Sequence, residues 1–133
     1  MKTFQTLTCY LPIIETDNFG KWICGKSGKS NSIQMPYVSY SDMVRHFIHD
    51  VYDFADLHPD YGLHNYSAIL ESNNIKWEKH SLESVDVAKL DEKCVMALLV
   101  GAVRAERFCD GVLFVLFENG TIRKWLLRLK ELD

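Results

Sequence analysis

Apolar residues recur every three or four positions over long parts of this chain, which is the spacing of one helix face. The pattern predicts a short helix over residues 3–15, with Pro12 inside it. It predicts a second helix that begins at Ser41 and ends before His58 and Pro59. A third helix is expected over residues 63–72, where two asparagines follow.

The last third of the chain has the densest apolar pattern. Residues 91–108 begin with an aspartate that can cap a helix, and they continue into a run without a polar face, which is typical of a central helix. Gly101 inside this run predicts the close approach of another backbone. Residues 112–117 fit a buried strand or a buried helix, and we choose a helix because cap-like residues frame them. Thr121 is expected to cap the last helix.

Residues 20–38 do not show the apolar spacing of a helix face. They are rich in glycine, serine and lysine between two short apolar segments, which favours a small β-hairpin or flap. The chain is therefore predicted to form one compact, mainly helical domain over residues 1–133. It should have about five helices and a small hairpin, with the last three helices forming the core.

Composition narrows the classes of protein. The chain has 133 residues, 47% hydrophobic and 25% charged, as in a soluble globular domain. Its net charge of −3 gives no chain-wide basic field, so we do not expect a nucleic-acid partner. The four cysteines form no C-x-x-C pair, no apolar run is long enough to span a membrane, and the N-terminus lacks the features of a signal peptide. We expect a cytoplasmic protein with reduced thiols, no membrane contact and no cofactor.

One stretch matches a nucleotide-binding pattern. Gly20 to Ser27 read GKWICGKS, which fits the phosphate-loop pattern G-x-x-x-x-G-K-[ST]. A phosphate loop follows a buried strand and leads into a helix, because its backbone N–H groups curl around the phosphates. Here ETDNF precedes the pattern, and the GKSNSIQMP that follows cannot start a stable helix. We therefore predict no nucleotide-binding site.

A stripe of histidines and aspartates lies on the second predicted helix. His46, His49, Asp50 and Asp53 are spaced to share one helix face. Imidazole and carboxylate groups at this spacing can bind zinc, iron or manganese. The same stripe also describes the solvated side of an amphipathic helix, and we favour this second interpretation.

The end of the apolar helix gathers charged side chains. Residues 103–111 read VRAERFCDG, and Glu106 continues the buried stripe, so its carboxylate is expected to face inward and to need a partner. In one interpretation Arg104 and Arg107 flank it, with Asp110 near Arg107, in a structural ion-pair network. In the other, the two guanidinium groups grip a phosphate, a carboxylate or an acidic residue of a partner. We favour the structural interpretation, and the sequence leaves both open.

The same stretch resembles the motif of a family of small bacterial proteins that is known only as a domain of unknown function. The family motif falls on Arg104, Glu106, Arg107, Phe108 and Gly111. MPYVSYSDMVRHFIHDVYDF and NYSAIL are similar to the family's middle part, so the resemblance covers residues 35–132 and leaves residues 1–34 less distinctive. It implies no activity, cofactor or partner.

Two functional hypotheses follow. The leading one is a small cytosolic bacterial protein, encoded by the host or by a phage or another mobile element, that binds another macromolecule without catalysis. Aromatic residues in poorly periodic contexts favour a protein interface, although partial burial against helices explains them equally well. These aromatic residues are Trp22, Tyr37, Tyr40, Tyr52, Tyr61 and Trp77.

The alternative is a small-molecule enzyme or sensor with an anion pocket at Arg104, Glu106 and Arg107. A fully paired Glu106 favours the binding module, whereas a concave pocket with an unpaired arginine favours the alternative. The sequence does not indicate an oligomeric state.

Overall fold

The computed structural model of the chain describes residues 4–23, 37–77, 82, 84–107 and 111–133. It is mainly helical and carries one small antiparallel sheet, as the sequence predicted. The α-helices are α1 (Gln5–Thr8), α2 (Leu11–Ile14), α3 (Asp42–Leu57), α4 (Tyr66–Ser72), α6 (Glu92–Ala105), α7 (Val112–Glu118) and α8 (Thr121–Leu132). The 3-10 turns are η1 (Pro59–Tyr61), η2 (Leu63–Asn65) and η3 (Val87–Lys89). The strands are β1 (Gly20–Ile23) and β2 (Tyr37–Tyr40), paired with Gly20 opposite Tyr40.

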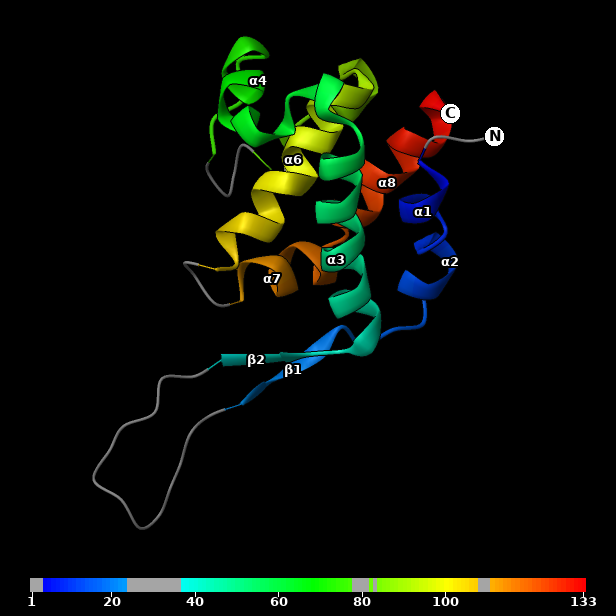
Figure 1. Cartoon of the computed structure of the whole chain (residues 1–133). Coiled ribbons are helices and arrows are strands. Elements are labelled where there is room, and N and C mark those ends of the chain that lie inside the picture. The colour runs from blue at the N-terminus through cyan, green and yellow to red at the C-terminus, as the bar shows by residue number, and fades with distance from the viewer. Residues whose placement is uncertain (1–3, 24–36, 78–81, 83, 108–110) are drawn as a thin grey trace, which may run out of the picture.

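Helix α6 is the centre of the molecule. Figure 1 shows it crossing the middle of the helical body, and it contacts α3, α4, α7 and α8. Its residues from Cys94 to Val103 are all buried. The prediction of a central helix without a polar face is therefore confirmed. The prediction that the last three helices form the core was too narrow, because α1, α2, α3 and α4 also contribute buried residues to it.

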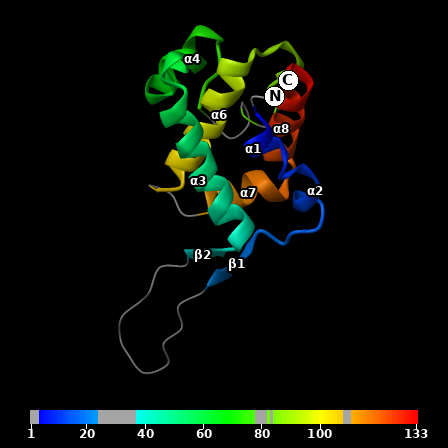
Figure 2. The same ribbon diagram turned by 45° about the vertical axis from the view of Figure 1, so that its right-hand side comes forward.

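Aromatic rings join the helices inside this core. The Phe117 ring of α7 lies edge-on to the Phe47 ring of α3, with centroids 5.3 Å apart, and stacks on Phe19 at 5.1 Å. The backbone N–H of Phe4 donates to a carboxylate oxygen of Asp133 at 3.0 Å, so the first and the last described residues lie side by side (Figures 1 and 2). The strands lie at the opposite end, beyond α7 (Figure 1).

Local caps explain where the long helices begin. The Ser41 hydroxyl accepts from the backbone N–H of Val44 at 3.4 Å, and the Asp91 carboxylate accepts from that of Cys94 at 2.9 Å. The cap expected at Thr121 was wrong. Thr121 is the first residue of α8, and its N–H donates instead to the side chain of Asn119 at 3.0 Å.

The N-terminal segment departs from its prediction. The single helix expected over residues 3–15 is two short helices, α1 and α2. Pro12 lies at the start of α2 and has no N–H to donate to the carbonyl of Thr8, which favours a break between α1 and α2. Within the described parts of the chain, no helix is both long and apolar enough to cross a membrane.

Candidate functional site

The Glu106 carboxylate links three segments at the end of α6. One of its oxygens, Oε1, accepts the Tyr40 hydroxyl of β2 at 2.6 Å and the backbone N–H of Leu113 at 3.0 Å. The backbone N–H of Gly111 donates to both carboxylate oxygens, at 3.0 and 3.1 Å. The Tyr40 hydroxyl in turn accepts the N–H of Phe114 at 3.1 Å. Glu106 thus has hydroxyl and backbone donors as its partners.

These bonds cap helix α7 from outside. The first backbone N–H groups of a helix lack partners within it, and Gly111, which precedes α7, has no side chain to supply one. Glu106 accepts from Leu113, and Tyr40 accepts from Phe114, so residues outside α7 satisfy two of its orphan donors. A carboxylate at a helix N-terminus is also favoured by the helix dipole. The cluster therefore fixes α6, α7 and the hairpin to one another.

Gly111 allows the hairpin to pack closely on this cap. Its φ of +95° is a conformation that other residues rarely adopt, and a Cβ atom there would lie 2.4 Å from the Trp22 ring. Trp22 also packs edge-on to Phe114, with centroids 6.4 Å apart. The glycine that ends the VRAERFCDG motif therefore makes room for a β1 side chain.

The two arginines of the motif differ in their surroundings. The Arg104 guanidinium lies over the Tyr66 ring, with Cζ 5.7 Å from its centre, and Arg107 is exposed. In the described part of the chain, neither arginine forms an ion pair with Glu106. Hydroxyl and backbone donors thus replace the expected arginine partners there. Asp110 and Phe108 lie outside the described residues.

The histidine stripe does not converge on one point. The His49 imidazole lies 3.2 Å from the Asp53 carboxylate, and both are exposed. Asp50 accepts the hydroxyl of Tyr10, and burial, followed by this hydrogen bond, raises the pKa of Tyr10 well above its usual value. His46 is exposed. Over the described ranges, no group of three or more histidine, cysteine or carboxylate side chains could hold a metal ion.

The first half of the phosphate-loop pattern is a strand. Gly20–Ile23 is β1, which pairs with β2 along its whole length instead of curling into a loop. The second half, residues 24–27, lies outside the described residues. The strand that should precede a phosphate loop is absent from the described residues 14–19.

A cavity of about 470 Å³ lies beside α4. It is lined by Tyr66, Ser67, Leu70, Glu71, Ile75, Lys76 and Trp77. The backbone N–H of Ile75 donates to the carbonyl of Leu70 at 2.9 Å, so the chain turns back along α4 after the helix ends. The Tyr66 and Trp77 rings meet edge-on at 6.4 Å.

Gly101 positions the aromatic walls of this cavity. A Cβ atom at Gly101 would lie 2.6 Å from the Trp77 ring and 3.2 Å from the Tyr66 ring. The close approach predicted at Gly101 is therefore made by two aromatic side chains and not by a backbone. Sequence reasoning missed the cavity, although the glycine inside an apolar helix was its signal.

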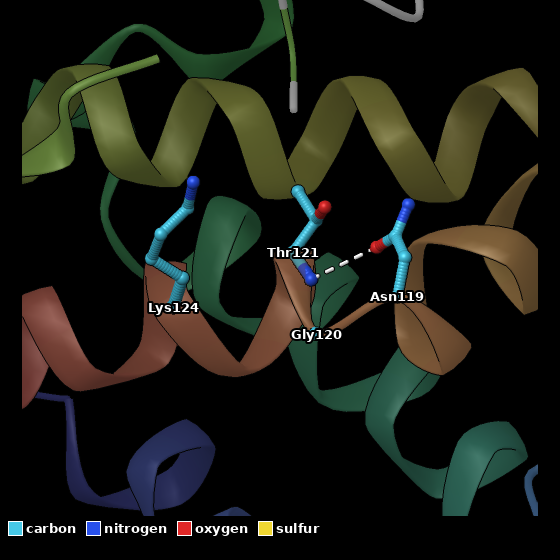
Figure 3. A pocket seen from close by; sticks show the side chains of 4 residues that line it. All are labelled: Asn119, Gly120, Thr121 and Lys124. Atoms are coloured by element: carbon cyan, nitrogen blue, oxygen red, sulfur yellow. Dashed lines mark hydrogen bonds between the residues drawn. The ribbon is translucent and has the colours of Figure 1, made fainter. Parts of the chain in front are cut away.

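A smaller cavity, of about 230 Å³, lies where α8 begins. Asn119, Gly120, Thr121 and Lys124 line it, and Figure 3 shows the side chains of Asn119 and Lys124 extending toward the same side. Asn119 and Lys124 also take part in further interactions. The lining of this cavity therefore does not indicate a ligand.

Comparison with known proteins identifies the family. No curated protein and no solved structure matches the chain. A family model matches residues 1–133, so it includes residues 1–34, where the sequence alone showed little resemblance. The chain therefore belongs to the family of unknown function DUF6508.

Proposed function

We propose that this protein is a non-catalytic binding module that recognises another protein in the bacterial cytoplasm, encoded either by its host or by a phage or another mobile element. One observation carries the proposal: the Glu106 carboxylate is engaged by Tyr40, Gly111 and Leu113. The most chemically promising cluster in the sequence is thereby used to hold the hairpin on the helices. Surface tryptophans add support, because Trp22 is 45% and Trp77 38% exposed, and tryptophan is enriched at protein interfaces.

The alternative, an enzyme or sensor with an anion pocket, finds no support in this arrangement. Arg104 covers an aromatic ring, and neither Arg107 nor Glu106 lines the two cavities described above. An anion site needs positive groups that converge on one point, and these two arginines do not.

A nucleic-acid partner is also disfavoured by the last helix. Arg123 pairs with Glu15 at 3.1 Å, and Arg128 pairs with Glu131 at 3.2 Å. Such pairing reduces the positive charge that α8 could offer to a phosphate backbone.

The test is capture of partners from a nuclease-treated bacterial lysate on the immobilised chain, followed by reconstitution. We expect a captured protein to bind again by calorimetry when both components are pure. Arg107→Ala, at an exposed position, should bind it as the wild type does. The proposal fails if a protein is captured from untreated lysate but not after nuclease treatment. It also fails if no protein is retained while phosphate or a carboxylate metabolite raises the melting temperature in a manner that Arg104→Ala abolishes.

A further inference from the structure

We infer that the cavity beside α4 is the recognition site for an uncharged aromatic side chain, a phenol or an indole, of the partner protein. This inference rests on the proposed binding function and adds the chemistry of the contact. It is carried by the shape, the rings and the charges of the cavity.

The size of the cavity suits a single anchoring side chain with its flanking backbone. Its volume of about 470 Å³ falls within the range of roughly 300–1,000 Å³ that ligand pockets occupy. Leu70 and Ile75 are buried and supply an apolar floor, while Ser67, Glu71 and Lys76 are exposed and place polar groups at the rim. An apolar floor with a polar rim matches a ring that carries one polar group.

The walls favour an aromatic ring over an aliphatic group. Tyr66 and Trp77 meet at an interplanar angle of 68°, so an incoming ring can lie against one of them and edge-on to the other. Such ring pairs add attraction beyond the burial of apolar area. Trp77 remains 38% exposed, so it has surface left for a partner to cover.

The charges around the cavity favour a neutral ligand. Glu71 and Lys76 supply one negative and one positive group at the rim. Because these two charges offset each other, a charged side chain would gain no net attraction at the rim to offset the loss of its hydration. The Arg104 guanidinium already lies over the Tyr66 ring. A phenol hydroxyl or an indole N–H can donate to Glu71 or Ser67 without adding a charge.

A substitution at Gly101 can change the shape of the cavity without creating a void in the core. An alanine Cβ atom there would press on the far end of the Trp77 ring, and Trp77 is partly exposed and able to shift. Gly101→Ala should therefore fold and displace one wall of the cavity. If it does not fold, Ser67→Phe fills the cavity from its exposed rim.

The experiment is an NMR titration of the full chain that follows the indole N–H signals. The probes are 4-methylphenol and, as an aliphatic control of similar shape, 4-methylcyclohexanol. We expect 4-methylphenol to move the Trp77 signal in a saturable way, while that of the fully buried Trp125 stays in place. The phenol should bind about 2–10-fold tighter than the cyclohexanol, which corresponds to one aromatic pair. Gly101→Ala should weaken binding severalfold, and Lys21→Ala, at an exposed position on β1, should not change it.

Further measurements distinguish a side chain of a partner protein from a free small molecule. They also distinguish failure of this inference from failure of the proposed function. N-acetyltyrosinamide has no charged ends, as in a partner chain, and should bind at least as well as free tyrosine. Binding of free tyrosine alone would assign the cavity to a small molecule and overturn the inference. An unmoved Trp77 signal, or equal binding of the two probes, would overturn it as well. If the purified partner still binds to Gly101→Ala and Ser67→Phe with full affinity, the inference falls while the proposed function stands. If the aromatic probes bind but no partner protein is captured, both the inferred partner side chain and the proposed function are overturned.

Discussion

Glu106 shows how one side chain can organise distant parts of a small domain. Its carboxylate accepts from the Tyr40 hydroxyl and from two backbone N–H groups at the start of α7. Hydrogen bonds to a charged group are stronger than those between neutral groups. The residue is partly buried, so its loss leaves several donors without an acceptor in a place that water reaches poorly.

Glu106→Ala should lower the free energy of unfolding by about 2–4 kcal/mol, because it removes the acceptor of the Tyr40 hydroxyl and of two backbone N–H groups. Urea unfolding, followed by circular dichroism, measures the change. The matched control is Arg107→Ala, one position away and exposed, which should stay within about 0.5 kcal/mol of the wild type. Equal losses in the two variants would show that Arg107 shares the anchoring role.

The hairpin is the element that depends most on tertiary contacts. Two strands of four residues are marginal by themselves in water. Here Trp22 packs over Gly111 and Phe114, and Tyr40 bonds to Glu106. The Asp17 carboxylate adds bonds to the Ser41 hydroxyl at 2.7 Å and to the Phe19 N–H at 2.9 Å where the strands meet the body.

Trp22→Ala should therefore loosen the hairpin while the helices stay intact. Amides of β1 and β2 should exchange with solvent roughly tenfold faster, which corresponds to a local loss of about 1.4 kcal/mol. Amides of α6 should keep their protection, because Trp22 packs on Gly111 and on Phe114 of α7. Hydrogen exchange read by mass spectrometry gives both quantities. Lys21→Ala, an exposed neighbour on the same strand, is the control and should change neither.

The sequence predicted the elements whose signals are local. The long helices α3 and α6 follow from their apolar period and from caps only three residues away, as with Ser41 and Val44. The Glu106 site was predicted as a cluster but with the wrong partners, since Tyr40 lies 66 residues away and no local pattern joins the two. The α4 cavity was missed for the same reason, because Trp77 reaches Gly101 only in the folded chain.

At the scale of the whole molecule, a buried thiol in the core makes the free energy of unfolding depend on pH in the alkaline range. Burial, with a smaller contribution from the nearby Asp91 charge, raises the pKa of the Cys94 thiol from 9.0 to about 11. The folded state therefore holds this proton more tightly than the unfolded state does. The resulting stability is fully present below pH 9 and is lost as pH rises toward 11.

The free energy of unfolding should thus fall between about pH 9 and pH 11, and it should fall less in Cys94→Ala. The comparison between the two proteins isolates Cys94, because the raised pKa of Tyr10 acts on both. Urea unfolding at several pH values provides the measurement. An identical pH dependence in the two proteins would show that the thiol does not titrate differently on unfolding.

The anchoring role of Glu106 is tested most directly by a double-mutant cycle of Tyr40→Phe and Glu106→Ala, with the free energy of unfolding as the readout. If the hydroxyl and the carboxylate hold the hairpin and α7 together, the two losses will not add. The expected coupling is about 1 kcal/mol or more, within the range of roughly 0.5–3 kcal/mol for residues in contact. Losses that add to within about 0.3 kcal/mol would mean that the two groups act independently, and Glu106 would then have to be reconsidered as a binding or catalytic group.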